Sequence, residues 1–173
     1  MATLHLISGL PCSGKSTYAA GVRADTNAVL FSLDRWLITA FGRYEITAVG
    51  HEEHTRRVLG CRELTWQSAS ELLARGADVI LDDGFFLREH RIRHITRAQE
   101  LGAGAKTHYL NTPLETIRVR LEARNARLPP FNFQIDPAML VGFRGLFEVP
   151  IASEGAELVV VTDLPEDRRP DVQ

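Results

Sequence analysis

The sequence is poor in several features, and each shortage excludes a class of protein. Its two cysteines, Cys12 and Cys61, match no metal-site spacing and no disulfide framework, so we expect reduced thiols. No apolar run approaches the roughly 18 residues of a membrane-spanning helix. The residues after Met1 enter a strand pattern directly, which leaves no room for a signal peptide. We therefore expect a cytoplasmic protein.

An excess of charge of one sign is also missing. The net charge of the 173 residues is -2 at pH 7, which gives no general attraction to nucleic acid or to an acidic membrane. The basic residues are nearly all arginine, because Lys15 and Lys106 are the only lysines. The length suits one folding unit, and 45% hydrophobic with 24% charged residues is ordinary for a globular protein.

Short apolar runs alternate with longer segments of helical periodicity. Each run has the length of a strand and suits burial on both faces. Such alternation predicts a parallel sheet with helices on both sides, which binds ligands outside the carboxyl ends of its strands. The five predicted strands cover residues 3–8, 28–33, 78–82, 105–110 and 156–162.

Capping signals mark the ends of several helices. Thr112 and Glu115 flank Pro113 as a capping box and predict a helix that runs to about Arg127. Asp136 is the predicted N-cap of a last helix that ends near Phe147. Further helices are predicted at 17–24, 35–41 and 47–75, the last ending at Gly76.

The segment "GLPCSGKS" at residues 9–16 fits the phosphate-loop pattern G-x-x-x-x-G-K-[ST] between a strand and a helix. Glycines let successive amides curl around an anion, Lys15 can reach the β- and γ-phosphates, and Ser16 can bind Mg²⁺. A flexible point charge is needed there, which explains a lysine among so many arginines. We expect ATP and Mg²⁺ to bind at Gly9, Pro11, Cys12, Ser13, Gly14, Lys15, Ser16 and Thr17.

Carboxylates follow two of the predicted strands. Asp34 ends "FSLD" and can accept a proton from an attacking hydroxyl, although it can also cap the next helix. Asp82 and Asp83 end "VILDD", where adjacent side chains face opposite sides of the sheet. We assign Asp82 to the Mg²⁺ shell and Asp83 to the acceptor; the reverse order and a turn-forming role stay open.

Arginines share one face of the predicted helix 113–127. Arg120, Arg124 and Arg127 follow an i, i+4, i+7 spacing, and the chain then breaks at "LPPFNF". A lid over about 118–137 that closes on ATP fits this pattern, and so does an ordinary solvated face. Surface positions are predicted for the arginines and histidines of other helices: Arg88, Arg91, Arg97, His51, His54, His90 and His94.

Aromatic side chains follow the candidate carboxylates. Trp36 comes after Asp34, and Phe85 and Phe86 come after Asp83. We expect them to line a small-molecule pocket, with membership of the core as the alternative.

These segments together resemble the small P-loop kinases of the polynucleotide-kinase and chloramphenicol-phosphotransferase group, which is related to zeta toxins and to adenylate-kinase-like folds. The resemblance runs from about residue 3 to 162 through "GLPCSGKST", "FSLDRWL", "VILDDGFFLREHR" and "RVRLEARNARLPP". It implies a general base at Asp34, an acceptor-side carboxylate at Asp83, and contacts of Arg120 and Arg124 with ATP phosphates. With Lys15, these residues form the expected catalytic set.

Two departures from that group bear on the acceptor. An arginine that holds the nucleic-acid phosphate in phage polynucleotide kinase is matched here by Leu37, and a polar residue of its acceptor site is matched by Phe85 or Phe86. Both departures argue against a polynucleotide acceptor. The lid sequence differs from that of chloramphenicol phosphotransferase, so the same drug is not implied.

The sequence thus predicts an α/β P-loop NTPase with a five-stranded parallel sheet and a helical lid. We expect one kinase domain over 1–163, a flexible tail over 164–173, and transfer of the γ-phosphoryl group to a hydroxyl of a small, partly apolar molecule such as an antibiotic or metabolite. The alternatives are a kinase of 5′-hydroxyl nucleic-acid ends and an ATP-binding switch without an acceptor. The acceptor's identity, the choice between ATP and GTP, and the oligomeric state stay open.

Overall fold

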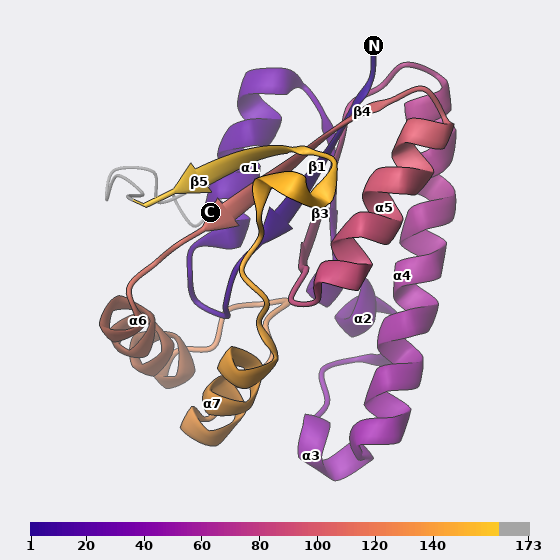
Figure 1. The fold of residues 1–173 in the computed structure, drawn as a ribbon. Coiled ribbons are helices and arrows are strands. Elements are labelled where there is room, and N and C mark those ends of the chain that lie inside the picture. Colours follow the sequence, from indigo (N-terminus) through magenta and orange to yellow (C-terminus); the bar gives the residue numbers. More distant parts are fainter. Residues whose placement is uncertain (163–173) are drawn as a thin grey trace.

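The computed structural model describes residues 1–162, so the predicted tail at 164–173 lies outside the described residues. Its centre is a five-stranded, all-parallel sheet in the order β2-β3-β1-β4-β5 (Figure 1). The predicted α/β fold with a parallel sheet is confirmed. The strands are β1 Thr3–Ser8, β2 Val29–Ser32, β3 Val79–Gly84, β4 Gly104–Leu110 and β5 Glu157–Val161.

Seven α-helices connect the strands of the described chain: α1 Lys15–Thr26, α2 Leu33–Phe41, α3 Ile46–Val49, α4 His51–Ala74, α5 Arg88–Glu100, α6 Leu114–Ala126 and α7 Pro137–Leu146. A short 3₁₀ helix, η1, spans Ala152–Glu154. No helix of residues 1–162 is both long enough and apolar enough to cross a membrane.

The long helix predicted at 47–75 is interrupted at Gly50, whose φ of 83° and ψ of 156° lie outside the helical region. Its predicted end is correct, because Gly76 takes a φ of 85° and donates to the Leu73 carbonyl at 3.0 Å. Ala77 donates to the Leu72 carbonyl at 3.0 Å, which completes a Schellman motif.

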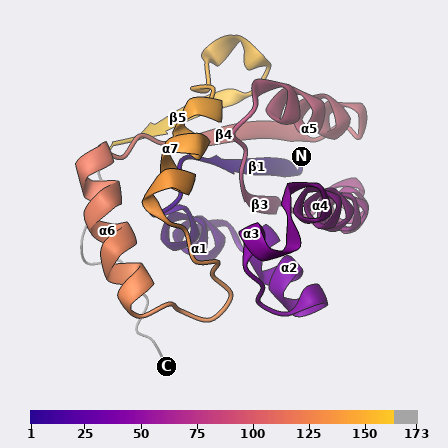
Figure 2. The same cartoon turned by 90° about the horizontal axis from the view of Figure 1, so that it is seen from below.

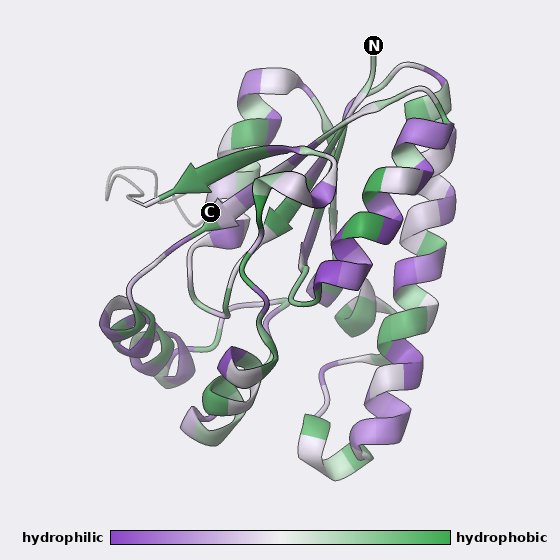
Figure 3. Ribbon diagram, in the orientation of Figure 1, coloured by the Kyte–Doolittle hydropathy of each residue, from purple (hydrophilic) through white to green (hydrophobic). Residues whose placement is uncertain are grey.

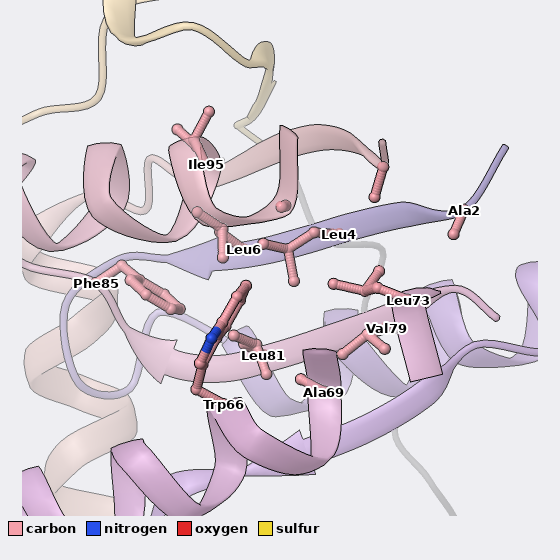
Figure 4. Close-up of a cluster of buried hydrophobic side chains, with 12 residues drawn as sticks. Ala2, Leu4, Leu6, Trp66, Ala69, Leu73, Val79, Leu81, Phe85 and Ile95 are labelled. Carbon is pink, nitrogen blue, oxygen red and sulfur yellow. The ribbon is translucent and has the colours of Figure 1, made fainter. Parts of the chain in front are cut away.

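Alternating side chains bury both faces of the sheet. Leu4, Leu6 and Leu81 pack on the face covered by α4 and α5, together with Trp66 and Phe85 (Figure 4). The next residues along the strands, Ile7 and Ile80, pack on the opposite face with Ala19 of α1. Viewed from below, α1 lies on one side of the sheet, while α4 and α5 lie on the other (Figure 2).

The carboxyl ends of the strands face α6 and α7 (Figure 1). Helix α7 begins as predicted, because the Asp136 carboxylate accepts from the Met139 N–H at 2.8 Å. The capping box predicted for α6 is wrong. That helix begins at Leu114 with Pro113 as its N-cap, and the Thr112 hydroxyl donates instead to the Ser13 carbonyl of the phosphate loop at 2.9 Å.

Two residues predicted at the surface of α5 are core residues. The Arg91 side chain is 0% exposed, and its Nε and Nη2 each donate to a Glu154 carboxylate oxygen at 2.7 Å. His94 is buried between the rings of Trp66 and Phe85. Helix periodicity reads arginine and histidine as polar, so it cannot detect a buried partner elsewhere in the chain.

The strand β5 that follows η1 is largely hydrophobic (Figure 3).

Candidate active site

The phosphate loop joins β1 to α1 in a turn that depends on glycine. Gly9, Cys12 and Gly14 have φ angles of 153°, 61° and 95°. A Cβ atom on Gly9 would lie 2.8 Å from Ser13 Oγ and 3.2 Å from the Leu110 carbonyl oxygen, so a larger residue would force the loop to shift. Gly14 is the N-cap of α1, whose N-terminus favours anions. The same turn contains Pro11, Lys15, Ser16 and Thr17.

Lys15 lies inside this turn, and its Nζ donates to the Leu10 carbonyl at 2.8 Å. Burial lowers the pKa of Lys15, while the negative charges of Asp82 and Asp34 oppose that shift. The ammonium group thus lies within electrostatic range of two carboxylates, Asp82 of β3 and Asp34 of α2. A negatively charged ligand in the loop would meet a preformed positive group.

The side chain of Asp82 lies beside the phosphate loop. Ser16 Oγ donates to Asp82 Oδ2 at 2.8 Å. Burial raises the pKa of Asp82, and the charge of Lys15 together with the Ser16 hydrogen bond opposes that shift. The structure therefore places Asp82, and not Asp83, beside the loop hydroxyl.

Asp83 faces away from Ser16 and forms a bidentate ion pair with Arg62 of α4. Arg62 Nε and Nη2 donate to the two Asp83 carboxylate oxygens, each at 2.6 Å. Both residues line a small cavity together with Phe31, Thr65 and His94. The sequence offered no signal for Arg62, because it lies 21 positions before its partner on a different element.

Asp34 lies in the first turn of α2, directly after β2, and its side chain is exposed at the same edge of the sheet. The N-cap of α2 is Ser32, so Asp34 does not cap the helix. The surrounding protein still withdraws solvent from the carboxylate. This desolvation, followed by the negative charge of Asp82, raises the pKa of Asp34 to about 6, while Lys15 acts in the opposite sense.

Two of the three arginines predicted for the lid point toward the loop region. Arg120 Nη1 donates to the Ser13 carbonyl at 3.4 Å, and Arg124 Nη2 donates to the Phe133 carbonyl at 3.4 Å. The positive charge of Arg124 also lowers the pKa values of Asp34 and Lys15. Arg127 follows the helix as its C-cap and is exposed.

The predicted aromatic residues differ in burial. Phe85 is 1% exposed and packs in the main core, which corrects its assignment to the acceptor pocket. The cause is a left-handed backbone at Phe85, with a φ of 42°, which turns the ring inward. Phe86 is half-buried against Phe143 and Phe147, and Trp36 is half-buried beside Phe31.

Of the residues predicted for the site, Lys15, Ser16, Asp82 and Asp34 lie together at one edge of the sheet, whereas Asp83 pairs with Arg62, Phe85 is in the core and Phe86 packs on Phe143 and Phe147. Ser16 and Asp82 form a hydroxyl and carboxylate pair beside the loop, and Asp34 lies close enough for its charge to act on Lys15. The sequence missed Thr112, because its capping pattern described a different role. No cluster of three or more histidine, cysteine, aspartate or glutamate side chains suited to a metal occurs within residues 1–162.

A family model and several solved structures match the chain. The AAA_33 family model, described as an AAA domain, matches residues 4–140. No curated protein matches the chain by sequence. The solved structure of Chaetomium thermophilum Kti12 in complex with ADP-AlF3 is similar, with a TM-score of 0.69 and 18% identity over 95% of this chain and 92% of that chain.

Two further structures are similar over almost the whole chain. A gluconokinase from Sinorhizobium meliloti has a TM-score of 0.61 and 16% identity, covering 93% of this chain and 82% of that chain. The Mycobacterium tuberculosis APS kinase CysC, in complex with AMPPNP and APS, has a TM-score of 0.57 and 18% identity, covering 99% and 90%. At such identities the likeness shows a common fold alone.

Proposed function

Because the chain belongs to the AAA_33 family of AAA domains, we propose that it is an ATP-dependent kinase that phosphorylates a hydroxyl of a small, partly apolar molecule such as an antibiotic or metabolite. One observation carries the proposal. Asp34 lies in the first turn of α2 directly after β2, at the edge of the sheet where the phosphate loop lies, and its charge acts on Lys15. A nucleotide-binding loop alone needs no such group.

The loop and the lid arginines bind the nucleotide in this proposal. Peptide N–H groups of Cys12, Gly14, Lys15 and Ser16 are the donors to the phosphates, and Lys15 leaves the Leu10 carbonyl to bind the β- and γ-phosphates. Arg120 and Arg124 approach from α6 and neutralise charge on the transferred group. Their present partners are backbone carbonyls at 3.4 Å, weak contacts that phosphate oxygens can replace.

Ser16 and Asp82 fit a Mg²⁺ ion. A hydroxyl and a carboxylate are oxygen ligands of the kind this ion prefers, and the two side chains already meet at 2.8 Å. When bound, Mg²⁺ neutralises charge on the nucleotide phosphates. The negative charge of Asp82 also favours the ammonium form of Lys15, against the effect of burial on the pKa of that group.

Asp34 is the general base of the proposed reaction. The acceptor oxygen forms a bond to the γ-phosphorus, the bond from that phosphorus to the β,γ-bridging oxygen breaks, and ADP leaves. The hydroxyl proton passes to the Asp34 carboxylate. With a pKa of about 6, Asp34 is mostly ionised at neutral pH and is a stronger base than an ordinary aspartate.

The acceptor side contains Asp83 and its partner Arg62, with Trp36 and Phe86 as candidate walls. The bidentate pair fixes both side chains, so Asp83 can accept a hydrogen bond from the acceptor without changing its position. The half-buried Trp36 lies on the same helix as Asp34 and adds apolar surface.

Substitution of the proposed base tests the function. We expect Asp34→Asn to bind MgATP with nearly the parent affinity, measured by calorimetry, and to transfer phosphate about 10² to 10⁴ times more slowly. The acceptor is sought with ATP, Mg²⁺ and a panel of hydroxyl-bearing metabolites, nucleosides and antibiotics, read by a mass shift. Transfer at the parent rate by Asp34→Asn contradicts the base assignment, and hydrolysis without any acceptor across the panel favours a switch.

A kinase of 5′-hydroxyl nucleic-acid ends is the second candidate. Leu37 is buried and cannot hold a phosphate, but Arg62 supplies a guanidinium beside Asp83 from another helix. Labelled ATP with a 5′-hydroxyl oligonucleotide tests this directly. Phosphorylation of the oligonucleotide, with binding that weakens steeply as salt is added, would favour this candidate over a small acceptor.

A further inference from the structure

One of the hydrophobic clusters lies apart from the sheet and contains a residue from the predicted lid. Phe133, in the connection between α6 and α7, is 5% exposed. Figure 2 shows this connection extending toward α2 and α3. All its partners come from residues 33–61: Leu33, Trp36, Leu37, Ile38, Tyr44, Ile46, Val58 and Cys61. We call the space that the Phe133 ring fills among these residues the ring slot.

The ring slot is shaped for a planar ring. The Phe133 ring meets Tyr44 edge-to-face, with centroids 5.0 Å apart and an interplanar angle of 61°. His54 lies at 6.3 Å and 79°. The Tyr44 hydroxyl and His54 Nδ1 are hydrogen-bonded to each other at 3.0 Å, so these groups present no unpaired polar atom to the ring. Leu37 and Cys61 supply buried apolar surface.

The ring slot begins one helical turn from the proposed base. Asp34 and Leu37 are three residues apart on α2, so the side chains leave the same side of the helix. An acceptor with its hydroxyl at Asp34 would therefore direct its body along α2 toward the slot. The distance, about one turn or 5 Å, is the length of a short linker between a hydroxyl and a ring.

The contact that holds Phe133 involves an arginine assigned to the nucleotide. Arg124 Nη2 donates to the Phe133 carbonyl at 3.4 Å, and the Nε of the same side chain is buried with no hydrogen-bond partner among the described residues. A phosphate group that binds Arg124 would satisfy the guanidinium better than this carbonyl. Nucleotide binding would thus remove one contact of the Phe133 backbone, and the ring would be held by its packing alone.

We propose that the ring slot is the acceptor subsite, and that the acceptor carries a planar apolar ring of about phenyl size that replaces Phe133. The inference rests on the proposed kinase function and narrows its acceptor to ring-bearing alcohols. Phe133 fills the ring slot until Arg124 binds the nucleotide. The ring of the acceptor then packs against the same residues. Alcohols without a ring fill the slot less well and are poorer substrates.

The reactivity of the Cys61 thiol reports whether the ring slot is open, and this measurement needs no phosphate transfer. This thiol is buried beside Phe133, and peptide mass spectrometry reads its modification separately from that of Cys12, the other thiol of the chain. The rate at which a thiol reagent modifies Cys61 is measured under three conditions. The first is the protein alone, the second adds Mg²⁺ and the non-hydrolysable analogue AMPPNP, and the third adds 2-phenylethanol to the second. We expect the analogue to raise the rate at least about tenfold, and 2-phenylethanol to reverse that rise.

Matched variants calibrate this measurement. Phe133→Ala should expose Cys61 without nucleotide, whereas Phe131→Ala, two positions away on an exposed ring, should not. If Phe133→Ala does not fold, Phe133→Leu serves as a partial opening of the slot. In parallel, transfer to 2-phenylethanol should exceed transfer to ethanol by at least about tenfold in kcat/KM.

The outcomes separate the two proposals. If calorimetry shows that AMPPNP binds but the Cys61 rate stays unchanged while Phe133→Ala raises it, Phe133 is a permanent core residue and the subsite is refuted, with the kinase function intact. Equal kcat/KM for the two alcohols also refutes it. If neither binding of nucleotide nor transfer of phosphate is detected, the proposed function itself fails, and the subsite fails with it.

Discussion

Loss of Glu154 should destabilise the protein far more than loss of any exposed acidic residue. The Arg91 and Glu154 side chains are 0% and 2% exposed, so Glu154→Ala leaves a buried guanidinium without its counter-charge. Breaking such a pair from one side costs about 3–5 kcal/mol. For a domain of this length that corresponds to a fall of about 6–20 °C in Tm.

Thermal and urea unfolding of matched variants measure this effect. Glu115 makes a comparable pair with Arg118 at 2.8 Å, but the Glu115 and Arg118 side chains are 80% and 58% exposed, so Glu115→Ala should change stability by less than about 1 kcal/mol. The double variant Arg91→Met, Glu154→Leu should recover part of the loss, because it removes the unpaired charge. A Glu154→Ala protein as stable as Glu115→Ala would refute the assignment of this pair to the core.

Two further predictions concern pH. Because the pKa of Asp34 is raised to about 6, kcat/KM should fall about tenfold per pH unit below that value; a profile that stays flat down to about pH 5 contradicts the base role. Burial lowers the pKa of His108 to about 4, below the 6.5 of the unfolded chain, so the unfolded state gains a proton first as pH falls. Up to about 3 kcal/mol of stability should therefore be lost between pH 6.5 and 4, and urea unfolding of His108→Gln should lack this part of the fall.

The parts of the site that follow each other along the chain could be predicted from the sequence. The loop at 9–16 follows β1, Asp34 follows β2, and Asp82 lies near the carboxyl end of β3, and in a parallel sheet those positions share one edge. Strand alternation also restricted the choice between Asp82 and Asp83, since neighbouring side chains face opposite sides. The Ser16 contact at 2.8 Å then identified which of them faces the loop.

The parts that depend on partners far along the chain could not be predicted. Arg91 looks like any polar residue of an exposed helix until Glu154, 63 positions later, is placed beside it. Arg62 presented the same difficulty with Asp83. Thr112 had a plausible local role, and a tertiary hydrogen bond to Ser13 overrode it. Phe133 gave no sign of burial, because it lies among loop residues outside any periodic pattern.

The central position of β1 also governs when the protein can fold during synthesis. Leu4 pairs with Val79 on one side, and Thr3 pairs with Gly104 on the other. During synthesis β1 therefore has no neighbour to pair with until the chain has grown past residue 79, and its second edge waits longer still. Long-range pairing of this kind slows folding, because the ends of a long loop must meet before any contact is gained. In a nascent chain, the apolar segment at 3–8 must stay unpaired through that interval, which makes it the natural point for chaperone binding.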